Sequence, residues 1–186
     1  HARDTSARAQ TRAVVSLDSV FFGDNAEFFS PFRTGETILG AWQRLNVDIS
    51  IGDKASLKLG LYSLERDGSE RRTELARPVA ALTMGNTRHR FIIGTLETGD
   101  RPAGFGPDRT TPHALLPPLA VETLWFSRAY EAGVQWKTNT EKFTQDVWFD
   151  YQKVITANHR ELFDGGVVGR YQWSSTAPVA LVYQFH

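Results

Sequence analysis

The sequence predicts an all-β fold, an up-and-down antiparallel transmembrane β-barrel. From Thr11 onward the chain carries about nine segments of roughly ten residues in which apolar and polar residues alternate. The connections between these segments vary between short and long, as they do in transmembrane barrels. The segments also approach the roughly 9–11 residues that a tilted strand needs to cross a bilayer.

The connections divide into two groups by length. The short ones are residues 52–54, 85–86, 138–141 and 174–178. The long ones are residues 23–35, 98–122 and 154–165, with 66–71 of intermediate length. Tight turns on one side of a barrel and longer loops on the other would produce this rhythm.

Residues that pair across an antiparallel hairpin point to the same side of the sheet, so the apolar phase predicts the register. For the first hairpin it selects a three-residue turn at 52–54, with Ile49 opposite Leu57. A two-residue turn at 85–86 would place Leu82 opposite His89.

Two further hairpins follow by the same test. The turn at 138–141 would place Trp136 opposite Phe143, and the loop at 174–178 would place Tyr171 opposite Leu181. A weaker alternation predicts an N-terminal strand over residues 13–21. We find no convincing helical period in the chain.

The two phases of these strands differ in chemistry. One phase is dense in charge and would line a lumen; its residues are Arg44, Lys58, Arg77, Arg88, Arg90, Glu131, Lys137, Asp146, Asp150 and Arg170. The other phase is apolar and carries aromatic residues near strand ends. As an aromatic girdle at the membrane interface we expect Trp136, Phe143, Trp173, Tyr183 and Phe185.

The composition narrows the function classes. Lys plus Arg equals Asp plus Glu at 21 each, so no net field would recruit nucleic acid. Cysteine is absent, which excludes disulfides and thiolate metal sites. No run approaches the roughly 20 apolar residues of a membrane helix, and the mean hydropathy of −0.34 is compatible with strands that are apolar on one face.

The predicted organisation is an N-terminal extension over residues 1–12 and a barrel over residues 13–186, with its longest loop at 98–122. A strand count of about nine is odd, whereas bacterial single-chain barrels have an even number. An unpaired edge cannot be satisfied in lipid. We therefore expect an incomplete part of a larger barrel, completed by further sequence after His186 or by another chain.

At this point the chain resembles bacterial outer-membrane β-barrels of the porin-like kind, an uncharacterised envelope barrel family. The run Asn25-Ala26-Glu27-Phe28-Phe29, followed by Gly35-Glu36-Thr37, is similar to the first loop of such barrels. The resemblance implies a location in the bacterial outer membrane, with membrane lipid and other envelope proteins as partners, and a role in passage or anchoring. It carries over no catalytic residue, and Phe185 is followed by His186 where such barrels usually end on the aromatic.

Motifs for catalysis or cofactors are weak. The run Gly104-Phe105-Gly106-Pro107-Asp108-Arg109 lacks the third glycine and the context of a dinucleotide fingerprint. The five histidines, His1, His89, His113, His159 and His186, show no metal-ligand spacing. Asp146 and Asp150 lie roughly 13 Å apart along one strand, too far for either glycosidase geometry. Glu131 would lie closer to Asp146 and could form a dyad with it, but we favour the interpretation of a solvated barrel wall, since structural charge networks also gather acidic residues. We expect no enzyme, no cofactor and no metal.

The leading hypothesis is porin-like passage of small polar solutes. Basic residues concentrate on the strand after Thr87 and acidic residues on the strands that follow, which would set a transverse field across the lumen. The segment 99–121 would act as a plug or constriction. One alternative is a non-conducting docking barrel that uses the apolar run 115–119. The other is a soluble carbohydrate-binding β-sandwich, in which Trp42, Trp125 and Trp148 stack on sugars.

Overall fold

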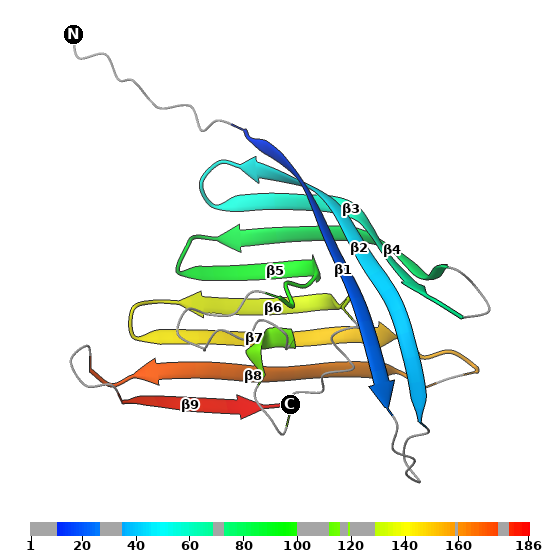
Figure 1. Cartoon of the computed structure of the whole chain (residues 1–186). Coiled ribbons are helices and arrows are strands. Elements are labelled where there is room, and N and C mark those ends of the chain that lie inside the picture. The colour runs from blue at the N-terminus through cyan, green and yellow to red at the C-terminus, as the bar shows by residue number, and fades with distance from the viewer. Residues whose placement is uncertain are drawn as a thin grey trace.

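The computed structural model describes residues 11–26, 35–68, 73–99, 112–115, 119, 129–158, 160–174 and 179–186. Within these residues the chain forms nine β-strands and one short 3₁₀ helix (Figure 1). The elements are β1 (Ala13–Ala26), β2 (Glu36–Ile51), β3 (Ala55–Arg66), β4 (Thr73–Gly85), β5 (His89–Thr95), η1 (Pro112–Ala114), β6 (Ala132–Asn139), β7 (Phe143–Lys153), β8 (Leu162–Gln172) and β9 (Ala180–Phe185).

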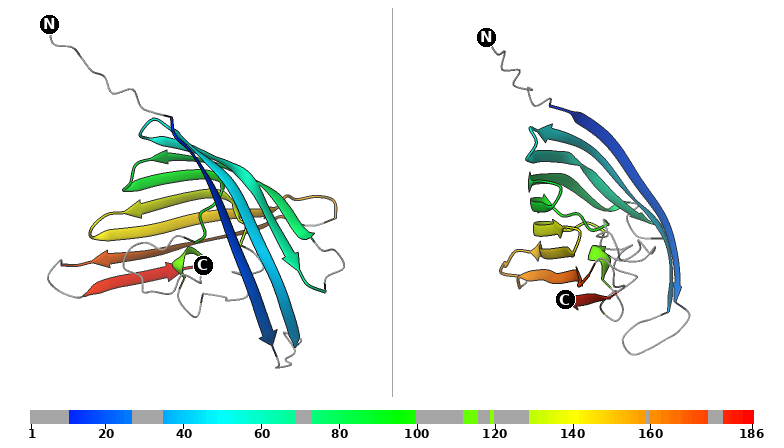
Figure 2. Two further views of the ribbon diagram at one scale, coloured as in Figure 1. Left: turned by 45° about the horizontal axis from the view of Figure 1, so that its top comes forward. Right: turned by 90° about the vertical axis from the view of Figure 1, so that its left-hand side faces the viewer.

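All nine strands belong to one antiparallel sheet in which each strand pairs with its neighbours in the sequence, from β1 to β9. The predicted all-β, up-and-down antiparallel fold is therefore confirmed. The sheet is strongly curved, and η1 lies on its concave side (Figure 2). Closure into a barrel is not seen, because β1 pairs with β2 and β9 with β8, which leaves both at the edges of the described sheet.

Two hairpin registers match the prediction. Ile49 pairs with Leu57 around the three-residue connection between β2 and β3. Tyr171 pairs with Leu181 across β8 and β9. The N-terminal strand also forms, and it runs on to Ala26, well past the predicted end at residue 21.

The other two registers were predicted wrongly, each by four residues. Leu82 pairs with Ile93 instead of His89, and Trp136 pairs with Val147 instead of Phe143. A slip of four keeps every side chain on its own face, so the apolar phase cannot detect it. Turn chemistry decides instead: the Asn86 side chain accepts hydrogen bonds from the next turn residues, and the Thr140 hydroxyl bonds Phe143.

The distribution of side chains over the two faces of the sheet is the reverse of that in a soluble protein. The convex face exposes large apolar side chains on strand after strand. Examples are Leu17, Leu45, Leu59, Leu61, Leu82, Ile93, Val134, Phe149, Leu181 and Phe185. The concave face instead holds the buried side chains, both apolar and ionisable. An exposed apolar surface of this extent marks contact with lipid or with another protein.

Two apolar clusters sit on the concave face. One consists of Phe22, Tyr62, Leu64, Val79 and Ala129, at the β1–β4 side. The other consists of Leu96, Leu115, Trp148 and Val168, where the residues next to η1 pack on β7 and β8. The concave face is thus a partly packed core and not a uniformly polar wall.

The aromatic residues predicted as a girdle lie mostly on the convex face. Trp136, Trp173 and Phe185 are exposed. Tyr183 lies across Gly169, where a Cβ would come within 2.3 Å of its ring, and its hydroxyl donates to Gln145 Oε1 at 3.0 Å. An aromatic ring over a strand glycine covers the backbone that the glycine leaves bare.

Much of the predicted loop at 98–122 lies outside the described residues, including residues 116–118 of the apolar run 115–119. Trp125, His159 and residues 1–10 also lie outside them. In the part of the chain that is described, no helix is long and apolar enough to span a membrane.

Candidate functional site

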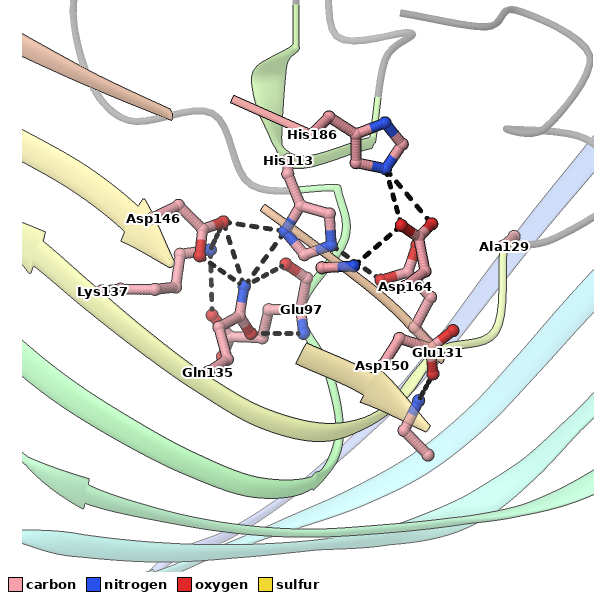
Figure 3. A network of polar contacts seen from close by, with 12 residues as sticks. Glu97, His113, Ala129, Glu131, Gln135, Lys137, Asp146, Asp150, Asp164 and His186 are labelled. Carbon is pink, nitrogen blue, oxygen red and sulfur yellow. Dashed lines mark hydrogen bonds and ion pairs between the residues drawn. The ribbon is translucent and has the colours of Figure 1, made fainter. Parts of the chain in front are cut away.

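The most densely bonded site centres on His113, which η1 carries onto the concave face (Figure 3). Its side chain is 1% exposed. Nδ1 lies 3.0 Å from Asp146 Oδ2, and Nε2 lies 2.7 Å from Glu131 Oε2. The backbone of His113 has a left-handed conformation, with φ 52° and ψ 19°. Its N–H donates to the carbonyl of Thr98. Such strain in a non-glycine residue is typical of functional positions.

The electrostatics of His113 follow from this geometry. Burial alone lowers the pKa of an imidazole, since it disfavours the charged form. Hydrogen bonds and charge from Asp146 and Glu131 outweigh that effect and raise the pKa of His113 to about 9. At neutral pH the ring is therefore an imidazolium that donates to both carboxylates.

Gln135 joins this centre to the chain before it. Its amide nitrogen donates to both oxygens of Asp146, at 2.9 and 3.0 Å, and to the carbonyl of Glu97 at 3.1 Å. Its amide oxygen accepts from the Glu97 N–H at 2.9 Å. The Glu97 carboxylate in turn pairs with Arg90 at 2.9 Å and with Lys137 at 3.4 Å. We call these residues, with His113, Glu131 and Asp146, the His113 cluster.

Aromatic and acidic groups border the cluster. The Trp148 ring stacks on His113, with centroids 3.9 Å apart and an interplanar angle of 1°. Asp150 and Asp164 pair across β7 and β8 on the same face. Asp150 Oδ1 accepts from the Ala132 N–H at 2.8 Å, and Asp164 meets His186 Nε2 at 3.0 Å.

The structure gathers some of the predicted lumen residues and separates others. Glu131, Lys137, Asp146 and, through Glu97, Arg90 belong to the His113 cluster. Arg88 and Arg170 line a pocket at the turn end of the sheet.

The remaining basic residues lie apart. Arg44 packs between Trp42 and Tyr62, about 6 Å from each ring centroid, and donates to the carbonyl of Ala129. Lys58 pairs with Asp48 at 3.7 Å. Arg77 is exposed beside its strand partner Tyr62.

Charge also varies along the strands. At the end of the sheet with short turns, one pocket is lined by three basic residues, Arg88, Lys142 and Arg170, and by one acidic residue, Glu141. In the middle, the His113 cluster mixes both signs. Toward the long-loop end the concave face carries Glu131, Asp150 and Asp164. Charge on the sheet therefore changes from basic to acidic along the strands, whereas the sequence predicted a change from one strand to the next.

Sequence reasoning missed three members of this site, His113, Gln135 and Glu97. The dyad considered for Glu131 and Asp146 proves to be two carboxylates that grip one imidazole from opposite sides. The available signal was the proximity of Glu131 and Asp146 with no basic partner assigned to them. Buried carboxylates require a hydrogen-bond donor between or beside them. Spacing in the sequence could not supply the donor, which comes from another segment.

The arrangement limits what His113 can do. Both ring nitrogens are taken by carboxylates, so the ring offers none to a serine as a triad histidine does. Among the described residues, no group of three or more His, Cys, Asp or Glu side chains could hold a metal ion. The site consists of one imidazolium, His113, hydrogen-bonded to two carboxylates. Glu131 is the more accessible carboxylate, since its side chain is 14% exposed and that of Asp146 is 0% exposed.

Comparison with known proteins supplies a family. Over residues 5–186 the chain matches the family described as Lipid A 3'-O-deacylase-type. A search of curated proteins found no match. A lipid A 3'-O-deacylase is a hydrolase that removes an acyl chain from lipid A. The predictions of a porin, of solute transport and of a protein without enzymatic activity are therefore wrong. Alternating strands are common to conducting and catalytic barrels, so the pattern alone could not separate them.

Proposed function

Because the chain belongs to the lipid A 3'-O-deacylase-type family, we propose that it is an outer-membrane hydrolase that removes an acyl chain from lipid A. The observation that carries this proposal is the burial pattern of the sheet. The convex face exposes apolar side chains, as contact with acyl chains requires, and the concave face buries an ionised cluster next to them in the same strands. A lipid ester has the same two parts, an apolar chain and a polar headgroup.

We assign the reaction to the Glu131 end of the His113 cluster. Ester hydrolysis needs a base to deprotonate the attacking water and a positive charge near the developing oxyanion. Glu131 is the partly exposed carboxylate of the cluster, and the imidazolium of His113 lies 2.7 Å from it. This pair provides both elements at one place.

The proposed step balances as follows. Glu131 takes a proton from water as the water oxygen bonds to the ester carbonyl carbon, which forms a tetrahedral oxyanion. Collapse of that oxyanion breaks the bond between the carbonyl carbon and the sugar oxygen. The sugar oxygen receives the proton from Glu131, and the acyl chain leaves as a fatty acid.

Asp146 acts as a positioning residue in this scheme, because it acts on the reaction through His113. Asp146 is fully buried and bonds the far nitrogen of the imidazolium, so it fixes the ring orientation and keeps it charged. Trp148, stacked on the same ring, prevents it from tilting.

The test compares Glu131→Gln with the native protein in outer membranes, with lipid A analysed by mass spectrometry for the loss of one acyl chain. Glutamine keeps the hydrogen-bond acceptor for His113 but not the basicity, so deacylation should fall by about 10²–10⁴-fold. The matched control is Glu161→Gln, because Glu161 is exposed and bonds Tyr151 away from the cluster.

Three outcomes are informative. Loss of activity in Glu131→Gln, with native heat-modifiability on gels, supports the assignment. Full activity in that variant would show that the base lies elsewhere. A native protein that leaves lipid A unaltered would overturn the proposed function itself.

A further inference from the structure

We propose that the pocket at the turn end of the concave face is a binding site for a phosphate monoester. The pocket has a volume of about 380 Å³. It is lined by residues of the β4–β5 connection, of the β6–β7 turn and of the adjoining parts of β6, β7 and β8. Its charged lining consists of Arg88, Lys142, Arg170 and Glu141. We call it the turn-end pocket.

The pocket follows from the register of three strands. Asn139 pairs with Thr144, and Thr144 pairs with Arg170, so the three side chains form one row across β6, β7 and β8. Arg88 joins the row from the β4–β5 connection, since its carbonyl accepts from the Asn139 N–H. The next row toward the middle of the sheet begins with Asp146 in the His113 cluster, two residues along β7 from Thr144.

The charges of the pocket are unbalanced. Three cations face one carboxylate, which leaves a net charge of +2. Among the described residues, neither the Arg88 guanidinium nor the Lys142 ammonium has an ion-pair partner. A doubly charged anion would neutralise this excess, and arginine matches the geometry of phosphate oxygens.

An independent observation points the same way. Thr144 is 5% exposed, and its hydroxyl is buried with no hydrogen-bond partner. A buried hydroxyl without a partner costs free energy, so such groups are rare in native proteins unless a ligand satisfies them. Thr144 lines the pocket between Asn139 and Arg170, where the hydroxyl can donate to a bound oxygen.

The size of the pocket favours a phosphate attached to a larger body. A volume of about 380 Å³ lies in the range of small-molecule sites. A sugar phosphate or a phospholipid headgroup presents the same dianion as free phosphate. The shared chemistry is the phosphate monoester, and the source is a matter for measurement. This proposal does not depend on the proposed hydrolysis.

The test is calorimetric titration of the full chain, refolded in a non-ionic detergent, with inorganic phosphate, glucose 1-phosphate and dihexanoyl phosphatidic acid. Saturable binding that weakens with ionic strength is expected. The tightest of the three ligands identifies the source. Acetate serves as the carboxylate probe and should bind at least tenfold more weakly.

Variants separate a binding role from a structural one. Arg170→Gln should weaken phosphate binding about tenfold or more, and Thr144→Val should weaken it several-fold without loss of stability. Glu141→Gln should tighten phosphate binding, because it removes the one negative charge in the pocket lining that repels the anion. Lys54→Gln, in the neighbouring exposed turn, is the charge-matched control and should bind as the native protein does.

Phosphate affinity unchanged in both Arg170→Gln and Thr144→Val would overturn the proposal. Equal affinity for acetate would overturn the phosphate assignment, and so would an equal loss in Lys54→Gln, which would indicate a diffuse surface charge effect.

Discussion

Two adjacent parts of the concave face use charge in opposite ways. In the His113 cluster every charged group meets an opposite charge or a hydrogen-bond partner, and His113 and Asp146 are almost completely buried. In the turn-end pocket, one row away on the same strands, three cations and one carboxylate surround a hydroxyl with no hydrogen-bond partner among the described residues. The first arrangement stabilises the fold from within, and the second leaves interactions open for a ligand.

The difference shows how to distinguish a polar network whose groups all have partners from an open binding site on the same surface. Removing a member of a satisfied network leaves its partners buried and unpaired, which is costly. Removing a member of an unsatisfied site costs the fold little or relieves it. Stability measurements on matched substitutions can therefore distinguish the two parts.

The largest expected effect is for Asp146→Ala. Its loss leaves His113, Gln135 and Lys137 without their shared acceptor, and breaking a buried ionic network costs about 3–5 kcal/mol. Denaturant unfolding in detergent micelles, followed by tryptophan fluorescence, measures the free energy. Asp48→Asn is the control, since the Asp48–Lys58 pair is partly exposed and should contribute less than about 1 kcal/mol. Equal losses of unfolding free energy in the two variants would show that the buried network contributes no more than an exposed ion pair.

The next effect is a pH dependence from His113. Its pKa rises from 6.5 in the unfolded chain to about 9 in the folded protein, so the folded state binds the proton more tightly. The stabilisation is complete below pH 6.5, declines as the pH rises, and is lost above pH 9; its full size is up to about 3 kcal/mol. Unfolding free energies measured from pH 6 to pH 10 should fall in the native protein and stay flatter in His113→Gln. Parallel curves would show that another group titrates.

The smallest effect compares two buried threonines. Thr95 Oγ1 accepts from the Ala80 N–H at 3.1 Å, so Thr95→Val should cost about 1–2 kcal/mol. Thr144 has no such partner, and Thr144→Val should be neutral or stabilise the fold by up to about 1 kcal/mol. The same unfolding assay, in phosphate-free buffer, decides between them. A loss in Thr144→Val as large as in Thr95→Val would mean that its hydroxyl is already satisfied in the folded protein.

The sequence was sufficient for the strands and their faces, because a period of two residues follows directly from strand geometry. Registers were accessible only where loop length and apolar phase agreed, as for Ile49 with Leu57. They failed where a slip of four residues preserved the phase, as for Leu82 and Trp136. Residues such as Arg44, Lys137 and Asp146 share one phase of the sequence alternation, but which of them meet depends on neighbouring strands.

The His113 cluster was out of reach for a different reason. Its central residue is brought to Asp146 and Glu131 by a segment without strand periodicity, so only the tertiary structure reveals the contact. The catalytic class was equally inaccessible, because strand alternation is indifferent to whether a barrel conducts or hydrolyses. Two carboxylates close together on a concave face were the one available indication.

The left-handed backbone at His113 and Ala114, with φ 52° and 57°, has a consequence for the order of events during folding. Two successive residues in this conformation cost about 1–3 kcal/mol each and will not persist in an isolated segment. The hydrogen bonds of His113 to Asp146 and Glu131 compensate for this backbone strain, and they form only once β6 and β7 have paired. Docking of this segment must then be a late step that follows formation of the sheet, and His113→Gln should accelerate unfolding more than it slows folding.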